Sequence, residues 1–268
     1  MVRCARLAAQ ECHAFIISRV GIITQLLHYK ATYMPHIDDR NAVRDVIEGG
    51  GVRPLLAHLL GRCRMWFGGD RFTALSGALA KSIGSLRSRN NATPKLLDFG
   101  CGNMAISRHL VAIGVAASAF GVDTYPASAI DKEKFDCYRQ IDSGVRLPFS
   151  DREFDVAICV DVLHHIGVDN SVEVLRELGR ISQFVVVKDH FEYGKISRQL
   201  LRLADWYGNF AYSVNVPDRY YDRDLWSKTI QTAGLEELRL ETPVRIHKGL
   251  FGLIIRPGNH FISILSAA

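Results

Sequence analysis

The chain has 268 residues, of which 48% are hydrophobic and 23% charged, and its formal net charge is +5. This length allows one large domain, or one domain with an appendage, and is enough to bury a sizeable core. The mild positive charge comes without a dense run of lysine and arginine, so we expect no nucleic-acid partner. The six cysteines form no CxxC pair, which predicts reduced thiols and a cytoplasmic protein.

Near the start, residues 14–27 (AFIISRVGIITQLL) are apolar but are interrupted by Arg19 and Gln25. The stretch is too short and too broken to span a bilayer, and no signal-peptide cleavage site follows it. We expect an amphipathic helix packed on the domain, or a tail at residues 1–33 if Met34 is the natural start. Peripheral contact of this helix with a membrane surface is a third interpretation.

Helical spacing recurs up to the polar loop SRNNATP at residues 88–94, where we place a domain boundary. Residues 1–90 are then a helical appendage, and residues 91–268 are the main domain. Beyond the loop, strand and helix patterns alternate, which is typical of a parallel α/β sheet with crossover helices. Strands are expected at 95–99, 117–122, 138–142, 154–160 and 184–188, and helices near 104–113, 126–135 and 170–180.

The part that follows the alternating region has a different character. Residues 190–221 are rich in aromatic residues and show no strand pattern, so we expect an insertion that covers the ligand site as a lid. Asp222 is a suitable N-cap for a helix that ends at Gly234. Alternating apolar and polar residues at 235–246 and 260–265 then predict the closing strands.

The most informative segment is LLDFGCGNMAISRHL, which predicts a strand, a glycine loop and a helix. Gly100, Gly102 and Ala105 fit the dinucleotide fingerprint GxGxxA, which is weak evidence by itself. Asp98 precedes this loop, and its carboxylate would repel a pyrophosphate and attract an amine. The N-terminus of the following helix can receive a carboxylate. The site therefore suits a zwitterion.

Two further acids extend this pattern. Asp123 ends the next strand, 21 residues beyond Gly102, where an acid binds a ribose diol in nicotinamide and other nucleoside sites alike. Asp142 ends a third strand and is placed to accept a hydrogen bond from an adenine amino group. An amino acid joined to a ribose and an adenine is S-adenosylmethionine.

Together, LLDFGCGN, GVD, LPFSDREFDVAICVDVLHHI and AGLEELRL resemble class I S-adenosylmethionine-dependent methyltransferases, in the small-molecule group that includes quinone-biosynthesis enzymes. The resemblance covers residues 94–266. It implies a Rossmann-like α/β fold: a seven-stranded, mostly parallel sheet with an antiparallel last hairpin, here with N-terminal helices added. It also implies a cofactor site made of Asp98, Gly100, Cys101, Gly102, Asp123, Thr124, Asp142, Ser143, Val160 and Asp161.

The chain departs from the family pattern in three places. Met104 stands where a third glycine is usual, so we expect a different loop shape or a looser approach of the cofactor. The spacing from Asp142 to Leu147 is one residue longer than usual, which leaves Asp142 and Ser143 open as the adenine contact. RISQF replaces the usual turn glycines after the helix that ends near Arg180.

Candidate catalytic residues follow the predicted strand FVVV. Methyl transfer from a sulfonium is an in-line displacement by an aligned nucleophile, so no fixed triad is expected. Lys188, Asp189 and His190 either form a solvated loop or bind the acceptor, with Asp189 or His190 taking its proton. His165 is a third candidate base. A metal site from Asp161 and these acids and histidines has no enforcing ligand spacing, so none is predicted.

The sequence thus predicts a biosynthetic enzyme that transfers a methyl group from S-adenosylmethionine to a small-molecule acceptor at oxygen, nitrogen or carbon. A nucleic-acid acceptor is disfavoured because VDVLHH stands where amino-methyltransferases of nucleic acids have an Asn/Asp-Pro-Pro-aromatic motif. Two alternatives remain open: an NAD(P)-dependent oxidoreductase, and a non-catalytic partner subunit with the methyltransferase fold. The oligomeric state is open.

Overall fold

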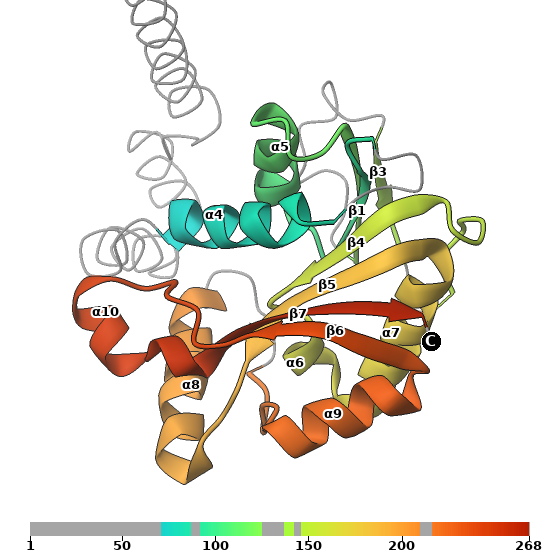
Figure 1. Ribbon diagram of the computed structural model, residues 1–268. Coiled ribbons are helices and arrows are strands. Elements are labelled where there is room, and N and C mark those ends of the chain that lie inside the picture. The colour runs from blue at the N-terminus through green and yellow to red at the C-terminus, as the bar shows by residue number, and fades with distance from the viewer. Residues whose placement is uncertain (1–70, 87–91, 125–136, 142–145, 210–215, 268) are drawn as a thin grey trace, which may run out of the picture. The chain divides into compact units, whose positions relative to one another are not determined.

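The computed structural model describes residues 71–86, 92–124, 137–141, 146–209 and 216–267 (Figure 1). By its internal contacts the chain divides into two units, Met1–His58 and Leu59–Ala268, and every described residue belongs to the second. The apolar stretch at 14–27 and the helix expected near 126–135 lie outside the described residues. The division at residue 90 stays a prediction. None of the described helices is long and apolar enough to cross a membrane.

Seven strands form one sheet in the order β3-β2-β1-β4-β5-β7-β6. Strands β1 to β5 pair in parallel, whereas β7 is antiparallel to both β5 and β6. This arrangement confirms the Rossmann-like sheet with an antiparallel last hairpin. The strands are β1 Lys95–Phe99, β2 Ser118–Asp123, β3 Tyr138–Gln140, β4 Phe154–Val160, β5 Ser182–His190, β6 Leu235–Glu241 and β7 His260–Ala267.

Helices cover both faces of this sheet (Figure 1). Helices α4 and α5 lie on one face, and α7 and α9 lie on the other. Helix α6 follows β4, and α8 follows β5 directly. The helices are α4 Arg71–Gly84, α5 Ala105–Ala112, α6 Leu163–Ile166, α7 Val168–Ile181, α8 Gly194–Asn209, α9 Arg223–Thr232 and α10 Gly249–Ile254, with a 3-10 turn at Pro257–Asn259.

Side-chain alternation along the strands builds one hydrophobic core on each face. Leu96 packs in the core with α4 and α5, whereas its neighbour Leu97 packs in the core with α7 and α9. In β5, Val186 belongs to the first core, and Val185 and Val187 belong to the second. This explains why the predicted strand FVVV reads as a continuous apolar run, since both of its faces are buried.

Several strand boundaries differ from the sequence-based expectation, and the ends of β5 and β6 have a clear physical reason. Strand β5 runs to His190 rather than stopping at 188, because Asp189 and His190 continue the ladder opposite Phe261 and His260 of β7. Strand β6 ends at Glu241, just before Thr242 and Pro243, because proline has no N–H for the ladder. The Lys-Asp-His sequence is therefore part of the sheet and not of a solvated loop.

The start of α9 agrees with expectation. The side chain of Asp222 accepts a hydrogen bond from the backbone N–H of Leu225 at 2.8 Å, as an N-cap should. Gly234 has a φ of 74°, the left-handed conformation that favours glycine just beyond a helix end. Both the N-cap residue and the glycine beyond the helix end therefore lie at the positions that the sequence predicted.

Candidate functional site

The glycine loop lies at the carboxyl end of β1 and bends over the end of β2. The backbone N–H groups of Gly100 and Cys101 donate to the carbonyl oxygen of Val122, at 2.9 and 3.2 Å. The N–H of Gly102 donates to Oδ2 of Asp123 at 2.7 Å. The acid that sequence analysis assigned to the ribose therefore also holds the loop in place.

Gly100 is the point where this loop meets the segment after β4. Its φ is 69°, and a Cβ there would lie 2.3 Å from a methyl group of Val162. No side chain fits at that distance, so the position requires glycine. The contact also brings Val162, and hence the start of α6, against the loop.

Met104 replaces the usual third glycine and keeps the backbone conformation that glycine would favour. Its φ is 59°, and its side chain is fully buried. The side chain occupies the space that Gly121 leaves, since a Cβ on Gly121 would lie 2.7 Å from the Met104 sulfur. The methionine is thus accommodated beneath the loop and does not extend over it.

Asp98 is buried, with 4% of its surface exposed. Burial raises its pKa to about 7, a hydrogen bond from Ser107 opposes the rise, and the charge of Asp123 adds to it. Among the described residues, no lysine, arginine or histidine forms an ion pair with Asp98. A buried carboxylate without a positive neighbour suits a ligand that brings its own cation.

The other predicted cofactor residues lie around this loop where they are described. Cys101 is half-buried, and burial raises the pKa of its thiol. Thr124 is exposed, with its hydroxyl 3.5 Å from Oδ1 of Asp123. Val160 ends β4, next to β1 in the sheet, and Asp161 follows it. Asp142 and Ser143 lie outside the described residues.

Asp161, which follows β4, contacts a group of positively charged and histidine side chains at the end of β5 and on α4. Its φ is 57°, and its N–H donates to the carbonyl oxygen of Lys188 at 2.9 Å. Its carboxylate forms short ion pairs with Lys188 and Arg71 and lies 3.2 Å from Nε2 of His190. Burial alone would raise the pKa of Asp161, but Lys188 and His190 hold it well below its usual range.

Asp189 forms the centre of the next set of contacts. It is fully buried, and its Oδ1 accepts from the backbone N–H of His190 at 2.7 Å. The same oxygen lies 2.6 Å from Nδ1 of His164, whose side chain is also buried. Burial would lower the pKa of His164, but the charge of Asp189 raises it above the ordinary value.

His164 is a residue that sequence reasoning missed. The HH pair after β4 is the signal that the sequence offers, and from that pair the sequence analysis names His165 as the candidate base. The structure buries His164, with 5% exposed, and leaves His165 half-buried, their rings 4.0 Å apart. Nε2 of His164 lies 3.4 Å from Oδ2 of Asp205 on α8, and the Tyr220 hydroxyl donates to the same carboxylate.

Two more histidines, which the sequence did not single out, surround His190. His260 lies opposite it on β7, with ring centres 4.9 Å apart, and His247 lies 5.2 Å beyond His260. Burial lowers the pKa of all three, and the charge of Lys188 lowers it further. His190 is therefore neutral at pH 7, with an Nδ1 that has no hydrogen-bond partner among the described residues.

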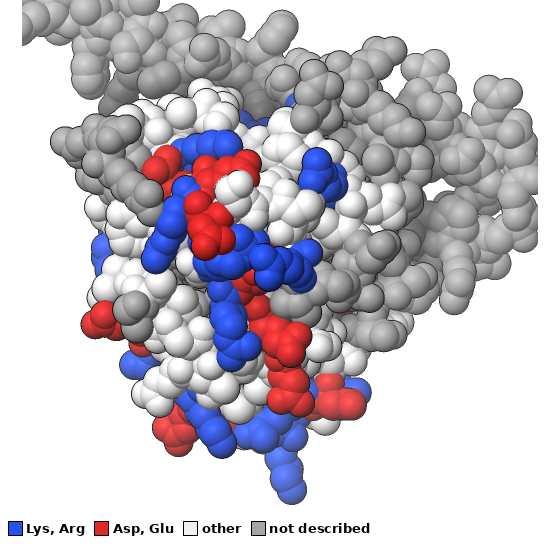
Figure 2. Space-filling view, turned by 90° about the vertical axis from the view of Figure 1, so that its right-hand side faces the viewer, with Lys and Arg blue, Asp and Glu red and all other residues white. Residues whose placement is uncertain are grey.

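Several charged side chains elsewhere in the described part of the chain form ion pairs. Arg180 on α7, for example, contacts both Asp151 and Glu177. Figure 2 shows one face of the molecule, on which lysine and arginine lie interleaved with aspartate and glutamate. That face offers no continuous basic surface among the residues that the structure describes.

The sequence and the fold were compared with known proteins. Residues 97–183 match the profile of a family described as "Methyltransferase domain", and the cofactor of such domains is S-adenosylmethionine. The sequence matches no curated protein. Similar solved structures include a chain from the complex between the Haloferax volcanii Trm112 methyltransferase activator and a methyltransferase, with a TM-score of 0.53 and 14% identity over 74% of this chain and 91% of that one.

A second similar structure is a protein from Pyrococcus horikoshii, with a TM-score of 0.51 and 16% identity over 74% of this chain and 90% of that one. At these identities the solved structures establish the fold. The family match covers the segment from within β1 to the start of β5.

Proposed function

Because residues 97–183 match a methyltransferase domain, we propose that this protein transfers a methyl group from S-adenosylmethionine to a small-molecule acceptor. The observation that carries the proposal is Asp98, a buried carboxylate with no positive neighbour among the described residues, beside a glycine loop. The ammonium group of the cofactor supplies the missing charge. A pyrophosphate would add negative charge at the same point.

The remaining cofactor contacts are proposed from the sequence and, where the residues are described, from their place at this edge. The cofactor carboxylate lies at the glycine loop and the N-terminus of α5, where backbone N–H groups favour an anion. Asp123 accepts from the ribose hydroxyls, and Asp142 or Ser143 contacts the adenine. Cys101, Thr124, Val160 and Asp161 line the same region, as the resemblance implied.

We assign the acceptor to the ends of β4 and β5. A lone pair of the acceptor attacks the methyl carbon, the carbon–sulfur bond breaks, and its electrons stay on sulfur as S-adenosylhomocysteine forms. His190 is neutral and can take the acceptor proton. Asp189 is already hydrogen-bonded, so we assign it a positioning role, and His165 stays an alternative base.

Segment 190–221 is proposed to cover this acceptor site. Its helix α8 brings Asp205 to His164, and Tyr220 is buried with its ring 5.4 Å from that of His164 and 6.1 Å from that of His190. Such a cover would exclude water from the reacting groups. The cytoplasmic location and the biosynthetic role stay predictions.

The proposal is tested by calorimetry with S-adenosylhomocysteine and with NAD, followed by transfer of a labelled methyl group to a panel of small acceptors. We expect S-adenosylhomocysteine to bind and NAD not to bind. Asp98→Asn should weaken binding, whereas Asp169→Asn, an exposed acid on α7, should not. Binding of NAD alone would support an oxidoreductase. Cofactor binding without transfer to any acceptor would support a non-catalytic partner subunit.

A further inference from the structure

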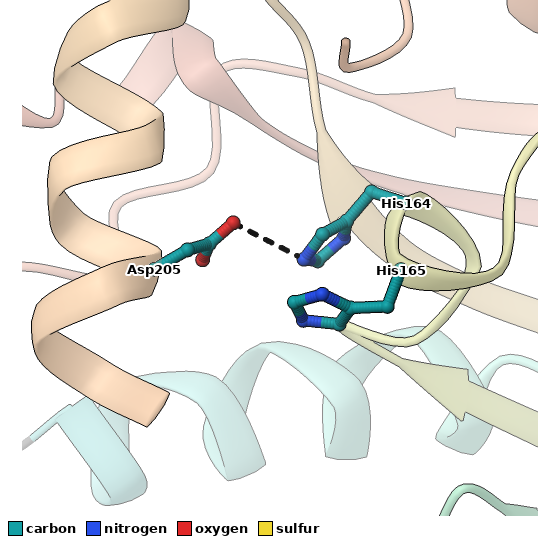
Figure 3. A group of neighbouring side chains, drawn as sticks. All are labelled: His164, His165 and Asp205. Carbon is teal, nitrogen blue, oxygen red and sulfur yellow. Dashed lines mark ion pairs between the residues drawn. The ribbon is translucent and has the colours of Figure 1, made fainter. Parts of the chain in front are cut away.

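Three side chains from two separate segments converge beside the proposed acceptor site (Figure 3). His164 and His165 come from α6, and Asp205 comes from α8. One donor atom from each lies within 4.8 Å of the others. Two imidazoles and one carboxylate form a ligand set that is common around first-row transition metals.

The distance between two of these donor atoms fits a shared ion. Nε2 of His164 lies 3.4 Å from Oδ2 of Asp205, and this nitrogen has no hydrogen-bond partner among the described residues. Zinc binds histidine nitrogen and carboxylate oxygen at about 2.0–2.2 Å. Two such donors at a tetrahedral angle are separated by about 3.4 Å.

The other nitrogen of His164 is held as it is in metal-binding histidines. Nδ1 lies 2.6 Å from Oδ1 of Asp189 and donates its proton to that carboxylate, so Nε2 is the nitrogen that can bind a metal ion, in exchange for any proton it carries. A carboxylate on the far nitrogen is the usual support of a ligating imidazole. Nε2 faces the Asp205 carboxylate, and a positive charge between them, either a proton on Nε2 or a metal ion, stabilises this arrangement.

Asp205 is supported in a comparable way. The hydroxyl of Tyr220, a buried residue, donates a hydrogen bond to Oδ2 of Asp205 and so orients the carboxylate toward His164. Ligating carboxylates are usually held by such outer hydrogen bonds. Both ligands therefore have the second contact that a metal site needs.

We propose that His164, His165 and Asp205 bind a divalent transition-metal ion such as Zn²⁺. This differs from the sequence-based expectation of no metal. Three protein ligands leave at least one coordination position open for water. If the proposed methyl transfer holds, that position takes the oxygen of the acceptor, and the ion lowers the pKa of its hydroxyl. This last step rests on the proposed function, whereas metal binding does not.

The test uses the full chain, freed of metal with a chelator and titrated with Zn²⁺ by calorimetry and with Co²⁺ by absorption. We expect one equivalent to bind, with a cobalt spectrum of nitrogen and oxygen ligands without thiolate bands. Asp205→Asn and His165→Gln should each lower the affinity more than about tenfold. Asp218→Asn, an acid with 98% of its side chain exposed, is the matched control and should bind as the unaltered protein does.

Three results would overturn the inference. They are no binding by the unaltered protein, thiolate bands in the cobalt spectrum, and unchanged affinity in both ligand variants. If the unaltered protein binds no metal ion, we would infer that a proton on Nε2 of His164, and not a metal ion, links it to Asp205. S-adenosylhomocysteine is titrated into the metal-free protein as a separate measurement. If S-adenosylhomocysteine does not bind, the proposed function is contradicted but the metal site is not. If the metal ion does not bind but S-adenosylhomocysteine does, the metal site is contradicted but the proposed function is not.

Discussion

The two halves of the carboxyl edge of the sheet place their acidic residues in opposite electrostatic environments. At the ends of β1 and β2, the buried Asp98 has no cation beside it among the described residues, and its pKa is raised to about 7. At the ends of β4 and β5, Asp161 contacts Lys188, Arg71 and His190, and its pKa lies well below the usual range. In the first half, a cationic ligand would supply the missing positive charge. In the second half, side chains of the protein already neutralise the carboxylate.

This difference in charge indicates that the two halves of the edge have different roles. A carboxylate that gains its counter-ion only on binding contributes to affinity for a cationic ligand. A network whose ion pairs are already formed holds its side chains in fixed positions before any ligand arrives. The contrast therefore predicts that the first half governs cofactor affinity and that the second governs turnover and folding stability.

The largest expected effect tests the division directly. His190→Ala should lower turnover about 10²–10⁴-fold if His190 takes the acceptor proton, and the affinity for S-adenosylhomocysteine should stay unchanged. Asp189→Asn should lower turnover through the position of His164 and His190. The measurement is steady-state kinetics with the identified acceptor, together with calorimetry of each variant.

Two outcomes of this kinetic test would change the assignment. A raised Michaelis constant with an unchanged turnover number would mean that these residues only position the acceptor. Full activity in both variants would remove them from the reaction and would leave the half at β4 and β5 with a structural role alone.

Stability gives the second test. Lys188 is fully buried against Asp161, so Lys188→Met leaves a largely buried carboxylate without its main partner. We expect the free energy of unfolding to fall by about 3–5 kcal/mol. Lys81→Met, an exposed position on α4, is the control and should change it little. The measurement is a denaturant titration. If Lys188→Met and the unaltered protein have the same free energy of unfolding, the ion pairs of the second half do not stabilise the fold.

The third test addresses the cofactor half. Asp123→Ala removes the acceptor of the Gly102 N–H and the proposed ribose contact. Binding of S-adenosylhomocysteine should weaken by about 1.5–3 kcal/mol, the contribution of hydrogen bonds to a charged group. Asp224→Ala, an exposed acid in the first turn of α9, serves as the control in the same calorimetric titration. If Asp123→Ala binds as tightly as the unaltered protein, Asp123 does not contact the ligand.

The smallest effect is a pH dependence of cofactor binding. With a pKa of about 7, Asp98 is protonated below pH 7, and an ammonium ligand must displace that proton. Affinity for S-adenosylhomocysteine should therefore fall up to about tenfold for each pH unit below 7 and level off above it. Calorimetry at pH 6, 7 and 8 measures this slope. Asp98→Asn should bind more weakly and show no slope, and a slope that persists would place the titrating group elsewhere.

Sequence reasoning identified the fold and the arrangement of the first half because their signals are local. Asp98, Gly100 and Gly102 lie within five consecutive residues, and Asp123 ends the next strand. Strand identity followed from apolar runs and alternation, which report burial on each face of the sheet. The sequence did not predict the conformation at position 104, because a methionine there indicated a different loop shape, whereas the structure gives Met104 a φ of 59°.

The second half could not be assembled from the sequence because its contacts join distant segments. Arg71 reaches Asp161 over 90 positions, and Asp205 and His260 come from elements with no recognisable motif. The choice between His164 and His165 depended on the direction in which each side chain points from α6. That direction is set by Asp189, which sequence analysis placed at the end of a strand and not in a buried contact with histidine.

The fit of Met104 against Gly121 has an evolutionary consequence. A Cβ at position 121 would lie 2.7 Å from the methionine sulfur, so the two positions cannot both carry a large side chain. The Cys101 sulfur would lie at the same distance of 2.7 Å from that Cβ. Among natural relatives we therefore expect residues larger than glycine at 121 only where the side chains at both 101 and 104 leave room for them.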